Sequence, residues 1–365
     1  MKRVYYNFCE LKDIIKRSLV NKYMLVASKR THEEFKEQLE AIGVPYVLFS
    51  QFGPNPQYDD ILEGLKILND NKFELLISIG GGSAIDTAKA IKAFSNMNPD
   101  ESYLNQPILA NNQITLVGIP TTAGSGSEAT KYSIIYQGNV KYTLTDPSLC
   151  CDYVILDYHL LITLPPYQRK ATVFDALCQA IEGYWAKSSN SESDEYALKA
   201  MELLFNNMEA YVQNSNDDDV LNDIMIGSYL AGKTISISQT TAAHAMCYKI
   251  TTTFGYAHGH SVGMTITSLF QFIYDNVDRS DNPQQLLNKL NQIALTLGYD
   301  NVPDCINAIE QRFDNYGLER ISITKEELDM LVNSINRQRL YNNPIPLTKE
   351  DIAFVYVKSV KQVRR

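Results

Sequence analysis

The chain has 365 residues, of which 45% are hydrophobic and 21% are charged, a balance typical of globular proteins and not of disordered, collagen-like or coiled-coil chains. This length is enough for two domains with buried cores. The 33 basic and 42 acidic side chains give a net charge of −9, which argues against a broad basic surface for nucleic acid or an anionic membrane. No apolar run has the length of a membrane-spanning helix, and the N-terminus lacks a signal-peptide pattern, so we expect a cytoplasmic protein with six reduced cysteines.

The first part of the chain alternates short apolar runs with amphipathic segments, which predicts parallel strands joined by crossover helices. The expected helices lie at residues 31–42, 58–70 and 84–95. The expected strands are continuously apolar, as in a sheet covered on both faces, and lie at residues 23–28, 45–50, 74–80, 114–120 and 153–157. Residues 131–146 predict a β-hairpin that turns around Gln137, Gly138 and Asn139.

Beyond Leu164 the apolar residues recur with helical spacing, and strand-like runs disappear. The sequence therefore predicts an α/β fold in two parts. Residues 1–163 form a dinucleotide-binding domain with a Rossmann-like parallel sheet. Residues 164–365 form an all-α helical-bundle domain that binds metal and substrate.

A glycine-rich turn follows the strand expected at residues 74–80. Gly80, Gly81 and Gly82 precede Ser83, a candidate N-cap residue, and then a helix. Glycines let the backbone approach a ligand closely, and the free N–H groups at a helix N-terminus suit a pyrophosphate. This pattern favours a bound dinucleotide, with a purely structural tight turn as the alternative.

A second polar loop, GIPTTAGSGSEAT at residues 118–130, offers hydroxyl and backbone groups to the other half of a dinucleotide. Alone, it could equally be a polar loop without a ligand. Together, GGGSAIDTAKA and PTTAGSGSE resemble the iron-containing, or group III, alcohol dehydrogenase family, which is related in fold to dehydroquinate synthase. The likeness extends over essentially the whole chain.

The resemblance implies ten contacts with a nicotinamide cofactor. They are Ser28, Asn55, Gly81, Gly82, Ser83, Asp86, Thr121, Thr122, Ser125 and Lys141. Ser28 stands where NAD-preferring relatives often carry an Asp that repels a 2′-phosphate, and Lys29 and Arg30 follow it. We therefore expect NADP(H) in preference to NAD(H).

Histidine is concentrated in one part of the sequence, because three of the five histidines lie within 17 residues. Upstream, Asp175 and Gln179 are spaced i, i+4 on a predicted helix. The sequence neighbours of Asp175 are apolar. Burying an unpaired carboxylate among them would cost free energy, which a bound cation would offset. The resemblance implies a divalent metal, Fe²⁺ or Zn²⁺, held by Asp175, Gln179, His244 and His258.

Two positions depart from the family pattern. Gln179 replaces the usual His, and an amide binds first-row transition metals more weakly than an imidazole, so this departure weakens metal retention. Tyr248 replaces a His near the substrate in many relatives, but it keeps a proton donor. His260, two residues after His258, is a candidate for substrate binding or proton relay, with a structural role as the alternative.

The segment at residues 236–264 resembles the phosphonoacetaldehyde reductase branch of the family. The implied reaction is the metal-dependent, NAD(P)H-linked reduction of a small aldehyde to a primary alcohol. The proton comes from water, a ribose hydroxyl or Tyr248. We expect phosphonoacetaldehyde as substrate and 2-hydroxyethylphosphonate as product. The alternatives are another small aldehyde (lactaldehyde, succinic semialdehyde or an aliphatic aldehyde), a lyase of the dehydroquinate synthase type, or a non-catalytic nucleotide-binding protein. A homodimer is the oligomeric state to test.

Overall fold

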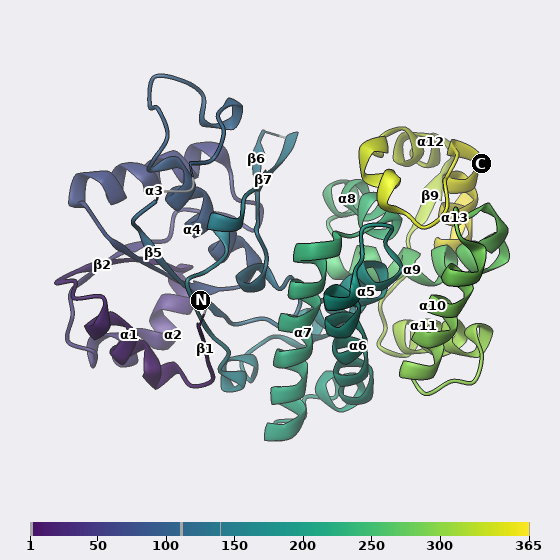
Figure 1. Cartoon of the computed structure of the whole chain (residues 1–365), viewed down its shortest axis with the longest axis horizontal. Coiled ribbons are helices and arrows are strands. Elements are labelled where there is room, and N and C mark those ends of the chain that lie inside the picture. Colours follow the sequence, from purple (N-terminus) through teal and green to yellow (C-terminus); the bar gives the residue numbers. More distant parts are fainter. Residues whose placement is uncertain (1–2, 110–111, 139, 365) are drawn as a thin grey trace. The chain divides into compact units, whose positions relative to one another are not determined.

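The computed structural model describes residues 3–109, 112–138 and 140–364, and the chain divides into two compact units (Figure 1). One unit contains the described residues of 1–122 and 126–161, and the other contains residues 123–125 and 162–364. The short stretch Ala123–Ser125 thus belongs with the second unit. A single boundary at residue 163, as predicted, would place this stretch in the first unit. A Cβ atom at Gly124 would lie 2.7 Å from the Thr172 side chain, so only glycine fits there.

The first unit is built on a six-stranded parallel sheet with the strand order β1-β8-β5-β4-β2-β3. Five of its strands are those predicted from the apolar runs, and the sequence pattern did not indicate the sixth, β1 at the edge. The strands are β1 (Arg3–Tyr5), β2 (Tyr23–Val26), β3 (Tyr46–Phe49), β4 (Leu75–Gly80), β5 (Thr115–Pro120) and β8 (Tyr153–Ile155). The predicted parallel α/β architecture is confirmed.

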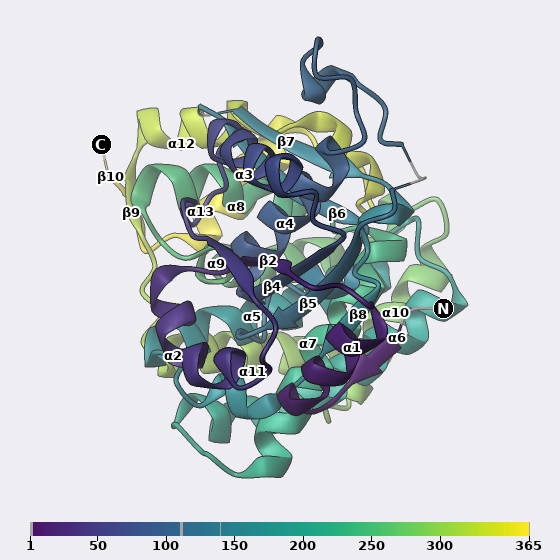
Figure 2. The ribbon, with the colours of Figure 1, turned by 90° about the vertical axis from the view of Figure 1, so that its left-hand side faces the viewer.

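Helices cover both faces of this sheet, as Figure 2 shows. On one face lie α1 (Leu11–Arg17) and α2 (Lys29–Glu40), and on the other lie α3 (Tyr58–Asn71) and α4 (Gly82–Phe94). Every residue of β2 and β4 is buried, which explains why their sequences are continuously apolar.

The predicted hairpin is present as β6 (Tyr132–Gln137) paired antiparallel with β7 (Val140–Thr145). Gln137 pairs with Val140, and Asn139, predicted in the turn, lies outside the described residues. Short 3-10 helices complete the unit. They are η1 (Phe8–Glu10), η2 (Tyr103–Asn105), η3 (Ser127–Ala129), η4 (Pro147–Leu149) and η5 (Tyr158–Leu161).

The second unit is largely helical, as predicted. Its helices are α5 (Pro166–Trp185), α6 (Ser191–Val212), α7 (Asp218–Ser238), α8 (Ala242–Phe254), α9 (His258–Asp275), η6 (Val277–Arg279), α10 (Pro283–Thr296), α11 (Val302–Asn315), α12 (Lys325–Asn333), η7 (Arg337–Asn342) and α13 (Lys349–Ser359). The all-helical expectation needs one correction. Two strands, β9 (Ser322–Thr324) and β10 (Gln362–Arg364), pair in parallel. At three residues each, they are too short to show a strand period.

Helix α5 is the centre of this unit and packs against α6, α7 and α9. Its C-terminal half is almost continuously buried, and Trp185 at its end meets the Phe270 ring edge-on, with 5.1 Å between ring centroids. The following helices begin at polar caps, since the Asn190 side chain accepts from the N–H of Ser193 and Asp217 accepts from the N–H groups of Asp219 and Val220. Helix α5 therefore offers a buried scaffold for polar side chains.

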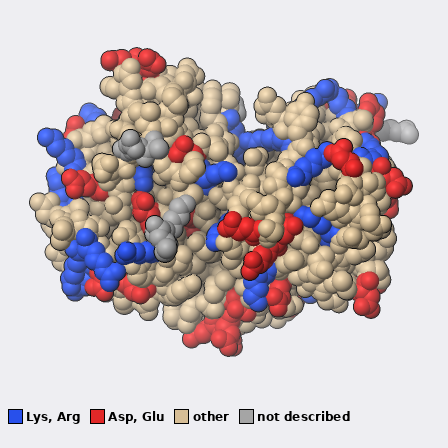
Figure 3. All heavy atoms as spheres, in the orientation of Figure 1, with Lys and Arg blue, Asp and Glu red and all other residues tan. Residues whose placement is uncertain are grey.

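None of the six cysteines, all of which lie in the described residues, forms a disulfide bond. Among the described residues, no helix combines the length and the apolar character that a membrane span requires. On the face shown in Figure 3, lysine and arginine side chains are interspersed with aspartate and glutamate.

Candidate active site

One candidate site, for the cofactor, lies in the first unit, where β4 and β5 end side by side. Gly80 is in register with Pro120, and the N–H of Thr121 donates to the Gly80 carbonyl at 3.0 Å. A Cβ atom at Gly81 would lie 3.3 Å from the Thr122 side chain. The sheet thus brings the two predicted cofactor segments to the same carboxyl edge, where α/β proteins bind nucleotides.

The glycine-rich turn differs from its prediction in one detail. Gly81, in extended conformation, is the N-cap residue of α4, and the helix begins at Gly82. Ser83 is not the cap: it lies in the first turn, and its hydroxyl donates to the Pro54 carbonyl. Gly80 has φ +152°, and a Cβ there would lie 2.8 Å from that of Ala84. The N–H groups of the first turn of α4 supply an anion site of the kind that binds pyrophosphate.

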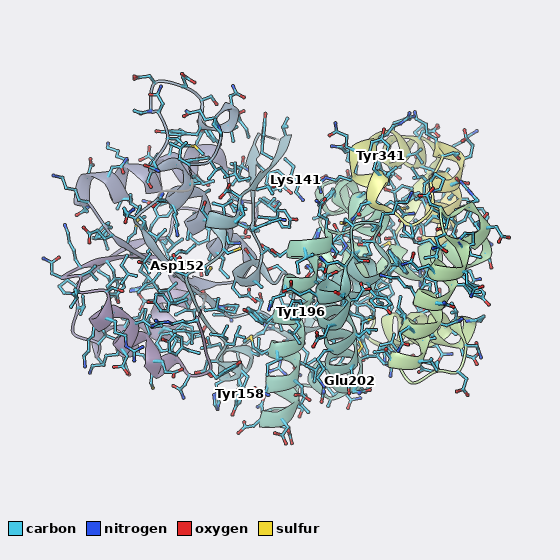
Figure 4. The ribbon with its side chains drawn as sticks, in the orientation of Figure 1. Lys141, Asp152, Tyr158, Tyr196, Glu202 and Tyr341 are labelled. Carbon is cyan, nitrogen blue, oxygen red and sulfur yellow. The ribbon has the colours of Figure 1, made fainter. Side chains whose placement is uncertain are left out.

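Ser28 and Asn55, predicted near the adenosine, and Lys141, predicted near the nicotinamide ribose, occupy separate places in the first unit. Ser28 is the N-cap of α2, where its hydroxyl accepts from the Thr31 N–H at 3.1 Å. Asn55 lies beside the β6–β7 hairpin, because the carbonyl of the next residue, Pro56, accepts from the Tyr136 N–H at 2.8 Å. Lys141 pairs with Tyr136 in that hairpin and is labelled in Figure 4. The roles of these residues toward a cofactor stay predictions.

Asp86 points into a buried polar network. Its carboxylate accepts from the Ser127 hydroxyl at 2.5 Å and from the Ile134 N–H at 3.1 Å. The Lys89 ammonium donates to the carbonyls of Ser127 and Thr130 at 2.5 and 2.8 Å. These bonds tie α4 to the polar loop and the hairpin, so Asp86 holds the loop in place, and its direct contact with the cofactor stays a prediction.

Glu128, in the same network, is expected to make the free energy of unfolding depend on pH. The side chain is buried, and desolvation raises the pKa of Glu128 to about 7 although the Lys89 ammonium opposes the shift. Between the unfolded pKa near 4.5 and about 7, the folded chain binds one proton more than the unfolded chain, so the free energy of unfolding falls as pH rises through this window.

We expect Glu128→Gln to lack this loss, so that between pH 4.5 and pH 8 its stability relative to the wild type rises by about 3 kcal/mol. Urea unfolding at both pH values measures the change. The exposed Glu74→Gln is the control and should track the wild type. A constant difference between Glu128→Gln and the wild type would show that Glu128 does not keep its proton in this window.

A second candidate site, within the second unit, is a cluster of side chains of the types that bind metal ions. Asp175 lies on α5, His244 on α8, and His258 is the first residue of α9. One donor atom from each lies within 4.8 Å of the others. The Nε2 atoms of His244 and His258 lie 3.3 and 3.9 Å from Asp175 Oδ1. Three residues separated by up to 83 positions thus converge, as predicted for a metal site.

Gly259 allows α9 to begin against α5. A Cβ atom there would lie 1.9 Å from the Ala171 carbonyl oxygen and 2.7 Å from Asp175 Cβ. No side chain fits in that space, so the glycine beside His258 is required for His258 to reach Asp175.

Gln179 follows Asp175 by one turn of α5 and is also buried. Its Nε2 donates to the Ser125 carbonyl at 3.3 Å, whereas its Oε1 is buried and has no hydrogen-bond partner. An unpartnered buried carbonyl oxygen is costly, and a cation would satisfy it. The predicted set of four therefore fits a divalent metal. The same bond places Ser125, predicted as a cofactor contact, next to Gln179.

The electrostatics of the cluster keep Asp175 ionised. Burial alone would raise the pKa of Asp175, but the rings of His258 and His244 beside it hold that pKa below its usual value. An ionised carboxylate is the form that binds a metal.

Glu182 is a site residue that the sequence analysis missed. Its buried carboxylate accepts from His244 Nδ1, from the Ala243 N–H at 2.7 Å and from the Thr241 hydroxyl at 2.6 Å. These bonds fix the His244 ring with Nε2 toward Asp175, the arrangement by which outer carboxylates orient metal-bound histidines. The spacing in the sequence could have indicated Glu182, because it follows Asp175 by seven residues and so lies on the same face of the helix.

We expect Glu182→Gln to weaken metal binding by about 10-fold, because the amide keeps one acceptor oxygen but loses the charge that orients His244. Competition with a chelator measures the dissociation constant. Glu195→Gln, at an exposed position on α6, makes the same change away from the site. Equal metal affinity in all three proteins would contradict the orienting role.

The two predicted catalytic residues have different surroundings. The Tyr248 ring stacks on His258, with 5.6 Å between ring centroids and 23° between planes. His260 is buried, with Nδ1 3.0 Å from the Tyr167 hydroxyl and Nε2 2.9 Å from the Glu319 carbonyl. Both ring nitrogens of His260 have protein partners, which fits the structural alternative, and its catalytic role stays a prediction.

Arg339, which the sequence analysis did not single out, lies beside Tyr248. Its Nη1 donates to the Tyr248 hydroxyl at 2.5 Å, and its guanidinium carbon lies 4.7 Å from the Tyr248 ring centroid. No pattern near residue 339 connects it to Tyr248, because 91 positions separate the two.

Comparisons with known proteins identify the family of this chain. Residues 6–158 match the family model "Iron-containing alcohol dehydrogenase", and residues 170–360 match its C-terminal counterpart. The chain is 26% identical to long-chain-alcohol dehydrogenase 1 of Geobacillus thermodenitrificans (89% of this chain, 84% of that protein). It is also 26% identical to 4-hydroxybutyrate dehydrogenase of Clostridium kluyveri (97% of each).

Among solved structures, sulfoacetaldehyde reductase from Bifidobacterium kashiwanohense in complex with NAD⁺ superposes with a TM-score of 0.86. The two are 24% identical over 99% of this chain and 97% of that one, a likeness that shows the fold. The family models cover most of both units, including the glycine-rich turn and all four predicted metal ligands. The chain belongs to the iron-containing alcohol dehydrogenase family.

Proposed function

We propose that this protein is a metal-dependent, NAD(P)H-linked reductase that converts a small aldehyde to its primary alcohol, with phosphonoacetaldehyde as substrate and 2-hydroxyethylphosphonate as product. The observation that carries the proposal is the convergence of Asp175, His244 and His258 beside the unpartnered Oε1 of Gln179. Family membership supports the alcohol–aldehyde chemistry.

When bound, a divalent metal supplies a Lewis acid for the carbonyl oxygen, and a reduced nicotinamide supplies the hydride. The chain's own residues do the rest. Asp175, Gln179, His244 and His258 hold the metal, and Glu182 keeps His244 in the correct orientation. The Tyr248 hydroxyl, on a ring stacked against His258, is the side-chain proton donor for the alcohol oxygen.

For the cofactor, we propose NADP(H) ahead of NAD(H). Ser28 is neutral and caps α2, so no carboxylate at this position repels a 2′-phosphate. Lys29 and Arg30 follow in the exposed first turn of that helix, where their positive charges attract it. The NAD⁺ in the similar solved structure belongs to that protein.

The substrate choice rests on local features, because relatives of equal identity are named for long-chain alcohols and for 4-hydroxybutyrate. Lactaldehyde, succinic semialdehyde and aliphatic aldehydes are the alternatives. The local features are Tyr248, whose phenol ring stacks on His258, and Arg339, whose guanidinium contacts that phenol.

The test is oxidation of NADPH and of NADH by the purified protein with each of these aldehydes, in samples stripped with a chelator and samples reloaded with Fe²⁺ or Zn²⁺. We expect turnover only after reloading, fastest with NADPH and phosphonoacetaldehyde. Turnover that persists in the stripped protein would contradict the metal site. Tight nucleotide binding without turnover of any aldehyde would favour the non-catalytic alternative.

A further inference from the structure

A positive side chain from the C-terminal part of the chain contacts Tyr248, the ring that stacks on the predicted metal ligand His258. Arg339 in η7 packs its guanidinium on the Tyr248 ring and donates to the Tyr248 hydroxyl. The same tyrosine ring also stacks on His258. Tyr248 therefore contacts both a permanent positive charge and a predicted metal ligand.

The segment that carries Arg339 is anchored. The Asn342 amide nitrogen donates to the carbonyls of Ser238 and Thr240, at 2.7 and 3.1 Å. Its Oδ1 accepts from the Ser188 N–H at 3.0 Å. These bonds fix η7 to the connection between α7 and α8, and α8 carries both His244 and Tyr248. The neighbouring Tyr341, labelled in Figure 4, is exposed on the same short helix.

The chemistry of this pair suits an anionic group on the substrate. A guanidinium presents a planar set of donors that matches two oxygens of a phosphonate or sulfonate, and it stays charged at every physiological pH. A two-carbon aldehyde with such a group on its second carbon reaches roughly 5 Å from its carbonyl oxygen to its outer oxygens, judged from standard bond lengths. That reach is similar to the 4.7 Å from the Tyr248 ring centroid to the Arg339 guanidinium carbon and to the 5.6 Å from the same centroid to that of His258.

We propose that Arg339 is the specificity-determining residue of this site and binds a tetrahedral anionic headgroup, phosphonate or sulfonate, on a two-carbon aldehyde. Tyr248 holds the guanidinium in place, and the aldehyde end lies at Asp175, His244 and His258. The inference rests on the proposed reductase function and names the group that selects its substrate.

The experiment compares wild type, Arg339→Gln, Arg339→Lys and Arg337→Gln as metal-loaded, full-length proteins. Arg337 is exposed on the same η7 helix, so its substitution removes the same charge two residues away. kcat/KM is measured with phosphonoacetaldehyde, with sulfoacetaldehyde and with propanal, which is neutral and of similar size. KM for NADPH is measured alongside, and circular dichroism checks the fold.

In Arg339→Gln, we expect the ratio of kcat/KM for the anionic aldehyde to that for propanal to fall by about 100-fold, since the substrate loses charge-assisted hydrogen bonds. Arg339→Lys should recover part of this ratio, because it restores the charge without the planar donor set. Arg337→Gln should keep the wild-type ratio. The larger loss, with phosphonate or with sulfonate, identifies which headgroup the site prefers.

Three results would overturn the inference. One is an equal loss for propanal and the anionic aldehydes, which would mean that Arg339 only positions Tyr248. Another is a wild type that reduces propanal without preferring either anion, which would leave the reductase proposal intact. The third is an effect confined to KM for NADPH. If the wild type reduces no aldehyde, calorimetry with 2-hydroxyethylphosphonate still decides: binding lost in Arg339→Gln supports the headgroup site, and equal or absent binding refutes it.

Discussion

Asp175→Ala is expected to lower kcat/KM for aldehyde reduction by at least about 1,000-fold and to leave the protein without stably bound metal. Asp175 is the charged member of the cluster, and its Oδ1 lies 3.3 Å from His244 Nε2 and 3.9 Å from His258 Nε2. Removing the carboxylate takes away the one anionic ligand that offsets a divalent charge in a buried site.

Metal content after dialysis and steady-state turnover measure this effect, and NADPH fluorescence reports nucleotide binding. Nucleotide binding should persist, because the glycine-rich turn belongs to the other unit. Asp218→Ala, exposed in the first turn of α7, serves as the matched control and should behave as wild type. An Asp175→Ala protein that turns over at the wild-type rate would remove the metal site from the proposed function.

The second large effect is expected at Gln179, the position where this chain departs from the family pattern. Gln179→Leu keeps most of the side-chain volume but removes the buried, unpartnered Oε1. If the roughly 10–16 kcal/mol of a protein metal site is shared among four ligands, the loss of a weak one corresponds to about 100-fold in metal affinity. Gln179→His, which restores the ligand of the relatives, should bind metal more tightly than the wild type.

Chelator competition gives the three dissociation constants, and the order His, then Gln, then Leu is the expected result. Gln292→Leu makes the same substitution at an exposed position of α10 and should leave the constant unchanged. If Gln179→Leu retained metal as tightly as the wild type, the amide would not be a ligand. If only Gln179→His reduced aldehydes, the parent protein would be a nucleotide-binding relative that has lost its activity.

Several features followed from local sequence alone. Continuously apolar runs indicated the parallel strands β2 to β5 and β8, and β2 and β4, which are buried throughout, have no polar side because both faces are covered. The glycine-rich turn was located by its position between a strand and a helix. Its cap was misplaced by two residues, since the extended backbone of Gly81, and not the hydroxyl of Ser83, begins α4.

Motif spacing and family resemblance also selected Asp175, Gln179, His244 and His258, which the fold brings together. The spacing i, i+4 on α5 is a property of one helix and can be read directly. The strands β1, β9 and β10 could not be predicted in this way, because three residues do not establish a period.

The sequence by itself determined the α/β class, the helical second unit and the residue types of the candidate metal site. The tertiary structure alone decided how these residues are supported. Glu182 meets His244 across 62 positions and Arg339 meets Tyr248 across 91. Such contacts depend on the packing of helices that are distant in sequence, and no local pattern of charge or hydrophobicity records which buried polar group will face which partner.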